Sequence, residues 1–128
     1  MSRAVLDASA LLAVHYGEAG AEKVLTALAF GAAMSALNLS EVVAKLTEDG
    51  IPADRIRRDI DAMELDIVNF DQELAYQTGL LCSITRRAGL SLGDRACLAL
   101  ARHLRLPVLT ADRVWQGVLP DVTVQVIR

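Results

Sequence analysis

The chain has 128 residues, of which 53% are hydrophobic, and its mean hydropathy is +0.35. These values are typical of one well-packed globular domain over residues 1–128, and they argue against a disordered chain or a two-domain enzyme. Sixteen acidic against 13 basic residues give a formal charge of −3, which argues against a wholly basic surface that binds nucleic acid through its phosphates.

Short apolar strands alternate with longer helical segments along the chain. In chain order we expect a strand at 4–6, helices at 8–16 and 18–29, a strand at 32–35, helices at 38–48 and 53–63, a strand at 66–70, a helix at 72–88, a helical stripe across 97–104, and strands at 108–110 and 122–127. Strands separated by helices favour parallel pairing with right-handed crossovers. The predicted fold class is therefore α/β, a three-layer α/β/α sandwich with a mainly parallel central sheet.

The N-terminal segment and the two cysteines indicate the compartment. The apolar run before Asp7 is too short for a signal peptide, and no stretch approaches the ~18 uncharged apolar residues that a membrane span needs. Cys82 and Cys97 lie among apolar helical residues and outside any metal-binding cluster, so we expect two buried free thiols. The sequence thus predicts a soluble cytoplasmic protein.

Four acidic residues lie where an α/β fold gathers ligand-binding side chains. Asp7 follows the first predicted strand and Asp112 follows the strand at 108–110, and ligands bind at the carboxyl ends of such strands. Glu41 and Asp94 lie three residues after an asparagine and a serine, which is also the spacing of a helix capping box. A cap or a turn can account for each acid alone, but together the four are placed to converge on one edge of the sheet.

Gathering four carboxylates is electrostatically costly. Two unit charges ~6 Å apart repel by roughly 3 kcal/mol at an effective dielectric constant of ~20, and a divalent cation offsets this repulsion. All-oxygen ligation suits Mg²⁺ or Mn²⁺, and the sequence has no set of cysteines and histidines for zinc. We therefore expect Mg²⁺ or Mn²⁺ as the cofactor, in a site suited to hydrolysis of a phosphodiester.

Four short motifs, in this order, resemble the signature of the PIN-domain family. They are V-L-D-A-S-A-L-L-A from Val5, M-S-A-L-N-L-S-E-V from Met34, L-G-D-R-A from Leu92 and V-L-T-A-D from Val108. The match runs nearly end to end, and a single domain this small most resembles the VapC toxins of type II toxin–antitoxin systems. The resemblance implies a Mg²⁺- or Mn²⁺-dependent endoribonuclease that forms a homodimer and is inhibited by a small VapB-like antitoxin.

The resemblance also implies a role for individual residues of these motifs. The implied catalytic residues are Asp7, Glu41, Asp94 and Asp112. The first three would hold the metal ion, directly or through water, and the fourth would complete the acidic site. Ser9 and Thr110 would orient the carboxylates by hydrogen bonds. Asn38 is a further candidate for this role, although helix capping alone could account for it.

The arginines are candidate RNA contacts. Eleven of the 13 basic residues are arginines, whose guanidinium groups suit bidentate phosphate contacts. Arg95 and Arg113 each adjoin one of the four acids, and Arg102 lies seven residues after Arg95 on the same helical face. Without the four acids, the chain has 12 acidic against 13 basic residues, so RNA binding near the site should depend on a bound cation. The aromatic content of 4% provides no evident platform for base stacking.

Two other functions remain open on the sequence. One is a non-catalytic PIN-fold module that binds RNA or protein, and the other is a housekeeping PIN nuclease without an antitoxin. A phosphoacceptor receiver domain is excluded, because it needs a lysine at a late strand end and both lysines, Lys23 and Lys45, lie on early helices. His15 and His103 lie near predicted helix ends, where a structural role is favoured over catalysis.

Overall fold

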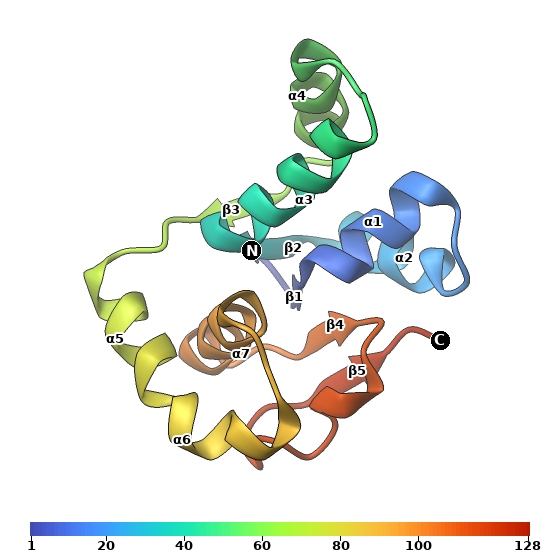
Figure 1. Ribbon diagram of the computed structural model, residues 1–128. Coiled ribbons are helices and arrows are strands. Elements are labelled where there is room, and N and C mark those ends of the chain that lie inside the picture. The colour runs from blue at the N-terminus through green and yellow to red at the C-terminus, as the bar shows by residue number, and fades with distance from the viewer.

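A single five-stranded sheet forms the centre of the molecule in the computed structural model, which describes residues 1–128 (Figure 1). The strands are β1 (Ala4–Leu6), β2 (Ala32–Ser35), β3 (Asp66–Val68), β4 (Val108–Thr110) and β5 (Val124–Val126). Their order is β3-β2-β1-β4-β5, and every neighbouring pair is parallel. The predicted three-layer α/β/α sandwich is confirmed, and its sheet is parallel throughout.

Seven α-helices and two short 3₁₀-helices connect the strands. The α-helices are α1 (Ala8–Tyr16), α2 (Ala21–Phe30), α3 (Ala36–Glu48), α4 (Ala53–Ala62), α5 (Gln72–Leu80), α6 (Cys82–Thr85) and α7 (Leu92–Leu104). The 3₁₀-helices are η1 (Arg86–Ala88) and η2 (Arg113–Trp115). None of the helices combines the length and the hydropathy needed to cross a bilayer.

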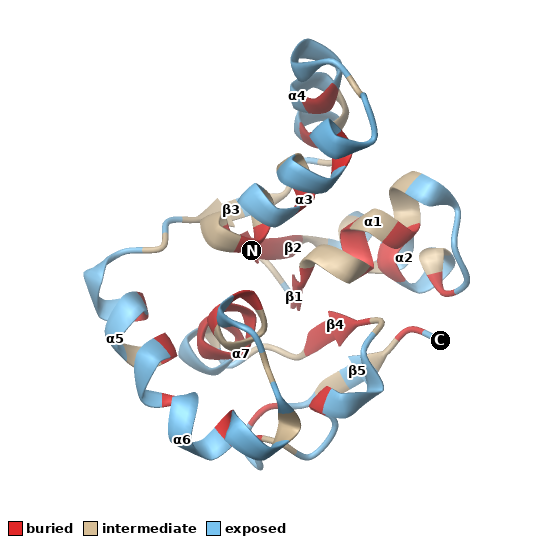
Figure 2. Cartoon of the chain, viewed as in Figure 1, coloured by how far each residue is buried: buried red, intermediate tan, exposed pale blue.

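Side chains along each strand point alternately to the two faces of the sheet, and this divides the hydrophobic core into two halves. Leu6 and Met34 pack in a cluster with side chains of α1 to α4, whereas Val5 and Ala33 pack with side chains of α5 and α7. Successive strand residues point to opposite faces, so each short strand contributes to both halves. Figure 2 shows the buried residues concentrated in β1, β2, β4 and α7, while α4, α5 and α6 are largely exposed. Helices α1 to α4 therefore cover one face of the sheet and α5 to α7 the other.

The sheet order fixes where a ligand would bind. From β1 the chain adds β2 and β3 on one side and β4 and β5 on the other. The carboxyl ends of β1 and β4 flank the point where the order reverses, and there the Asp7 N–H donates to the Leu109 carbonyl oxygen at 3.3 Å. In parallel sheets the crevice at such a switch point is the usual ligand site. The topology therefore places Asp7 at the expected ligand-binding edge of the sheet.

The starts of two helices differ from the sequence prediction. Helix α3 begins at Ala36, because the Ser35 hydroxyl caps it by accepting the Leu37 N–H at 3.2 Å. Asn38 therefore lies inside the helix, and the interpretation of Asn38 as its N-cap is wrong. Helix α2 begins at Ala21 and not at residue 18, because Gly20 takes a positive φ of 92° that a helix cannot continue through.

The predicted continuous helix over 72–88 is interrupted. Helix α5 ends at Leu80, and the Leu81 N–H bonds to the Thr78 carbonyl three residues back, which breaks the regular ladder before α6 begins. On either side of this region, Leu74 and Leu81 are both buried in the core half that contains α7. The strand predicted at 66–70 ends at Val68, since Asp71 caps α5, and the one predicted at 122–127 covers only Val124–Val126.

The cysteines were predicted correctly as free thiols, but only one is buried. Cys97 lies on the inner face of α7 and is fully buried. Cys82 is exposed at the start of α6, so the expectation that it is buried is wrong. Leu81 lies seven residues after the buried Leu74, on the same helical face, so that leucine and not Cys82 points toward the core.

Candidate active site

Asp7 is a buried carboxylate held by three hydrogen-bond donors at the carboxyl end of β1. It is the N-cap of α1, where its Oδ1 accepts the Ala10 N–H at 2.8 Å. The Ser9 hydroxyl donates to Oδ1 at 2.7 Å and lies 2.9 Å from Oδ2. The Thr110 hydroxyl donates to Oδ2 at 2.7 Å. Only 6% of Asp7 is exposed, so its orientation is fixed by the β1–α1 and β4 segments together.

Burial changes the protonation of this carboxyl. Removal from water raises the pKa of Asp7 from 3.8 to about 6, because the charged form loses hydration. The hydrogen bonds from Thr110, Ala10 and Ser9 lower the pKa but do not compensate, and the negative charge of Asp94 raises it further. A buried acid with a strongly shifted pKa at a sheet switch point is a candidate functional group.

The hydroxyls of Ser9 and Thr110 join Asp7 to the loop after β4. Ser9 Oγ accepts the Ala111 N–H at 3.0 Å, and Thr110 Oγ1 accepts the Asp112 N–H at 3.1 Å. Both hydroxyls donate to Asp7 at the same time. The expectation that these two residues orient a carboxylate agrees with these contacts.

Glu41 lies against the start of α7 with the help of Asn38. The Asn38 Nδ2 donates to Glu41 Oε1 at 2.7 Å and to the Gly93 carbonyl oxygen at 2.9 Å. A Cβ atom on Gly93 would collide with the Glu41 carboxylate. Asn38 is 1% exposed, and its Oδ1 has no hydrogen-bond partner. The amide thus fixes the α3 carboxylate to the first turn of α7, which is a positioning role and not a cap.

Asp94 is part of a capping box at the start of α7. The Ser91 hydroxyl accepts the Asp94 N–H at 3.2 Å, and Asp94 Oδ2 accepts the Ser91 N–H at 3.0 Å. The predicted structural role of this acid is therefore present. It also influences the site electrostatically, since the charges of Asp7, Asp94 and Glu41 all raise the pKa of the buried Cys97 thiol one turn along α7. Three of the predicted acids therefore surround the first turns of this helix.

Asp112, Arg95 and Arg113 each hydrogen-bond to a backbone group and not to one of the other acids. Asp112 lies at the sheet edge after β4, but its exposed carboxylate caps η2 by accepting the Val114 N–H at 3.0 Å. Arg95 lies in the first turn of α7, where its Nε donates to the Ser91 carbonyl at 3.3 Å. Arg113 Nε donates to the C-terminal Arg128 carbonyl at 3.2 Å.

Arg102 is not brought to this group. It lies in the last turn of α7, at the end opposite Asp94, and pairs with Asp121 at 2.8 Å. Eight residues of helix separate it from Asp94, about 12 Å along the axis. The seven-residue spacing correctly predicted the shared helix, but the same helix carries this arginine away from the acids. His15 and His103 lie in the last turns of α1 and α7, as expected.

The donor atoms around α7 suit a hard divalent cation. Oxygen atoms of Asp7, Glu41 and Asp94, and the unpartnered Oδ1 of Asn38, are the ligand type that Mg²⁺ and Mn²⁺ prefer, and no histidine or exposed thiol accompanies them. As they stand, no three acidic, histidine or cysteine side chains form a group that could hold a metal ion. The residues therefore fit such an ion in chemistry, whereas their side chains are not gathered into a set of ligands.

Gly93 is a site residue that the sequence argument did not single out. Its lack of a side chain leaves the space that the Glu41 carboxylate occupies. A signal was present, because glycine costs about 1 kcal/mol relative to alanine inside a helix and yet stands directly before Asp94. A glycine at this position indicates close approach of another group.

Comparison with known proteins identifies the family. The family model of the PIN domain matches residues 4–118. This chain belongs to the PIN-domain family. PIN domains are generally nucleases, and the match includes all four acids discussed above. No curated protein matches the sequence significantly.

Solved structures share the fold at low sequence identity. The DNA-bound VapBC from Salmonella typhimurium is similar with a TM-score of 0.76 and 16% identity, covering 100% of both chains. A toxin–antitoxin complex from Klebsiella pneumoniae gives 0.72 and 22%, covering 98% of each chain. VapBC-5 from Mycobacterium tuberculosis gives 0.63 and 20%, covering 100% of this PIN domain and 99% of that chain. The whole PIN fold of this chain thus has the architecture of chains in toxin–antitoxin complexes.

Proposed function

We propose that this PIN domain is a Mg²⁺- or Mn²⁺-dependent endoribonuclease and the toxin of a type II toxin–antitoxin pair. The observation that carries the nuclease proposal is the Asp7 carboxylate, which is buried at the sheet switch point and oriented by Ser9 and Thr110. Burying a carboxylate is costly, and a bound cation would offset that cost. The negative charges of Asp94 and Glu41 act on the same buried region as that of Asp7.

The residues would divide the work between holding the ion and holding the substrate. Asp7, Glu41 and Asp94 would hold the ion, and Asp112 would act from the loop after β4. When bound, a divalent cation supplies activation of water and neutralises charge on the phosphodiester. Thr110 and Ser9 keep the Asp7 carboxylate in place, while Asn38 keeps that of Glu41 in place. Hydrolysis should leave 5′-phosphate and 3′-hydroxyl ends.

Arg95 and Arg113 are the proposed phosphate contacts. Each uses its Nε to bond a backbone carbonyl, which leaves the terminal guanidinium nitrogens available for an RNA phosphate. Arg102 is already paired with Asp121 away from the acids, so we omit it from the proposed substrate contacts.

Cleavage of a panel of RNAs with Mg²⁺ or Mn²⁺ tests the nuclease. Wild type should cleave, whereas Asp7→Asn and Asp94→Asn should lose activity by at least about 100-fold. Asp71→Asn, which changes an acidic N-cap on α5 outside the site, is the matched control and should retain activity. Equal cleavage by wild type and Asp7→Asn would identify a contaminating nuclease and would refute the proposal.

A second candidate function is a PIN-fold module that binds RNA or protein without catalysis. The observation that favours it is that the acids do not form a three-residue group as they stand. Calorimetric titration with Mn²⁺ distinguishes the two. The nuclease requires a binding event that Glu41→Gln and Asp94→Asn weaken, whereas the binding module requires no event that depends on these acids.

The proposed toxin has a small antitoxin as its partner, acts as a homodimer and resides in the cytoplasm. The support is the similarity to chains in VapBC complexes over nearly the whole length. Inducible expression should arrest growth, and co-expression of the small protein encoded by the adjacent reading frame should relieve the arrest. Growth arrest that persists with Asp7→Asn would contradict a nuclease toxin, and the absence of a neighbouring antitoxin gene would favour a housekeeping nuclease.

A further inference from the structure

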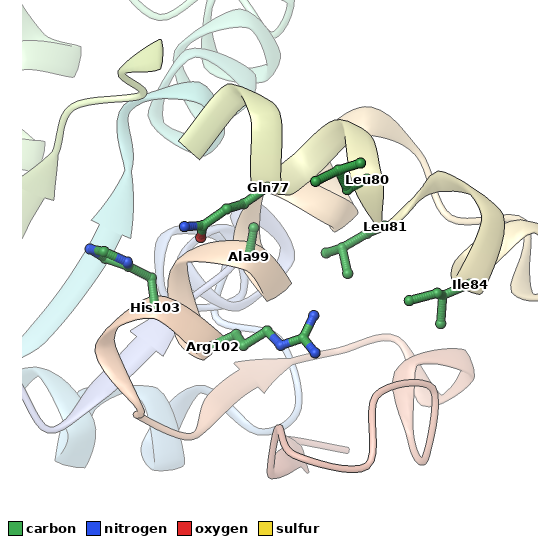
Figure 3. Close-up of a pocket in the computed structure, with 7 residues that line it drawn as sticks. All are labelled: Gln77, Leu80, Leu81, Ile84, Ala99, Arg102 and His103. Carbon is green, nitrogen blue, oxygen red and sulfur yellow. The ribbon is translucent and has the colours of Figure 1, made fainter. Parts of the chain in front are cut away.

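The amino edge of the sheet, where the strands begin, carries positive charge at the end opposite the candidate active site. Two pockets, of about 360 and 380 Å³, meet at Pro107 just before β4. Their linings contain four cations, which are Arg3, Lys23, Arg102 and Arg105. Arg102 extends from the last turn of α7 (Figure 3), and it is paired at 2.8 Å with Asp121, the only acid in either lining. A chain of net charge −3 therefore gathers unbalanced positive charge at this edge.

Three of these cations have no ion-pair partner within the chain. The four salt bridges involve none of Arg3, Lys23 and Arg105, and all three residues are exposed. The Val5 N–H donates to the Pro107 carbonyl oxygen at 2.8 Å, so the segment that follows Arg3 runs beside the segment that follows Arg105. Lys23 on α2 lines the same pocket as Arg3. Three unpaired charges from distant segments thus lie along one edge, where they can attract phosphates.

An exposed aromatic ring accompanies these charges. Phe30, the last residue of α2, is 62% exposed and lines the pocket together with Arg3 and Lys23. The Arg3 guanidinium lies over the ring, 5.8 Å from its centroid. Cations beside an aromatic face are the combination that binds single-stranded nucleic acid, since bases stack on the ring and phosphates pair with the charges. The low aromatic content did not indicate this platform, because only folding brings Phe30 and Arg3 together.

The backbone at Arg105 has a conformation that favours glycine. Arg105 is the C-cap of α7 at a φ of 57°, and its N–H donates to the carbonyl oxygens of Ala101 and Arg102. Glycine adopts this left-handed conformation without steric strain and is the usual residue at such a helix end. The cap uses only the backbone, so the fold does not require an arginine side chain here. Residues held in such conformations cluster where ligands bind, which favours a ligand contact for Arg105.

We propose that the amino edge of the sheet is a binding surface for single-stranded RNA. This amino-edge surface consists of Phe30 and the three unpaired cations, Arg3, Lys23 and Arg105. A base stacks on the Phe30 ring, and the neighbouring phosphates pair with the cations. Arg3 and Asp7 lie at opposite ends of β1, about 13 Å apart along the strand at 3.3 Å per residue. The surface is therefore separate from the candidate active site and holds a part of the strand away from the acids.

The inference rests on RNA as the substrate in the proposed function, but its tests need neither a metal ion nor cleavage. RNA binding near the four acids should depend on a bound cation, so in EDTA the amino-edge surface is the contact that remains. The nuclease proposal can therefore fail while RNA binding at this edge stands, and RNA binding at this edge can fail while metal-dependent cleavage stands.

Fluorescence anisotropy in EDTA provides the first test, with a labelled single-stranded RNA of about 12 nucleotides as the probe. Wild type should bind. Arg3→Gln and Lys23→Gln should each weaken binding by about threefold or more at low salt, and each should reduce the salt dependence of log Kd by about 0.7, the value for one phosphate contact on a single strand. Arg58→Gln is the matched control, because Arg58 on α4 is also exposed and outside every salt bridge. No binding by wild type, or an equal loss in the control, would overturn the proposal.

Variants of Phe30 test the stacked base. Phe30→Leu should weaken binding of the RNA by about fivefold or more, whereas Phe30→Tyr keeps the ring and should bind like wild type. Equal affinity of these two variants would overturn the proposed stacking. Unlabelled duplex DNA of the same sequence and polyglutamate should compete poorly, because neither exposes a base. Competition as strong as that of unlabelled single-stranded RNA would identify a duplex or an acidic peptide as the ligand and would overturn the proposal.

Arg105→Gly separates binding from folding. Glycine suits the positive φ, so the variant should unfold at a higher urea concentration than wild type. It should nevertheless bind the RNA about threefold more weakly or worse, because a phosphate contact is lost. A purely structural role for Arg105 would lower stability and affinity together. That result, or an unchanged affinity in the more stable variant, would overturn the place of Arg105 in the amino-edge surface.

Discussion

Replacing Asp7 by asparagine should stabilise the metal-free protein at neutral pH while abolishing its proposed activity. Asp7 is 6% exposed, and burial raises the pKa of its carboxyl from 3.8 to about 6. At pH 7 the folded protein therefore contains a carboxylate that has lost its hydration. Asparagine has nearly the same shape, is neutral at every pH, and caps helices about as well as aspartate.

The magnitude follows from the difference in pKa. A rise from 3.8 to about 6 corresponds to a loss of about 3 kcal/mol of folding free energy when the group is ionised. Between these two pH values the folded state binds more protons than the unfolded state, so the free energy of unfolding falls as pH rises and is then constant above about pH 6. Some of the gain from asparagine is lost because Thr110 and Ser9 must hydrogen-bond to an amide, which leaves about 1–3 kcal/mol.

Urea denaturation in the presence of EDTA measures this effect. At pH 7, Asp7→Asn should unfold at a higher urea concentration than wild type, and the gap should narrow toward pH 4. Asp71→Asn exchanges the exposed N-cap of α5 for the same residue type and should change the free energy of unfolding by less than about 0.5 kcal/mol at either pH. A less stable Asp7→Asn at pH 7, or a difference that does not depend on pH, would refute the assignment of a costly buried charge.

Three further substitutions test the supports of the site. Gly93→Ala places a Cβ where the Glu41 carboxylate lies, so cleavage and Mn²⁺ affinity should fall by about tenfold or more, although alanine forms helices better than glycine. An unchanged Mn²⁺ affinity in calorimetry would contradict a role for this contact. Thr110→Val removes a hydrogen bond to Asp7 and should lower the free energy of unfolding by about 1–3 kcal/mol, and it should raise the pKa of Asp7 further, as carboxyl NMR titration would reveal. Ser91→Ala removes the cap of α7 and should cost about 1 kcal/mol in urea denaturation; a loss below about 0.3 kcal/mol would show that the cap contributes little.

Local patterns in the sequence determined most of the secondary structure. The bounds of β1, α1, β2 and β4 match the prediction at every residue, because short apolar runs next to clear helical periodicity leave little ambiguity. The carboxyl-end rule for parallel sheets was sufficient to select Asp7 as a site residue before any contact was known. The errors occurred where glycines and capping side chains set a helix start, as at Gly20 and Ser35.

Contacts between distant segments had to be taken from the tertiary structure. Thr110 meets Asp7 across 103 residues, and Asn38 meets Gly93 across 55, so neither contact has a local signature. The same holds for Arg102, which shares a helix with Asp94 but pairs with Asp121 because the segment before β5 passes the far end of α7.

The sequence by itself thus determined the chemistry available to this PIN domain, and the tertiary structure decided how it is arranged. Residue types and spacings specify carboxylates at strand ends, since those features depend on neighbours a few residues away. The elevated pKa of Asp7 depends on burial, and the contact of the Glu41 carboxylate with Gly93 depends on two segments that only folding brings together. Desolvation is a property of the packed interior, and no local pattern of residues contains it.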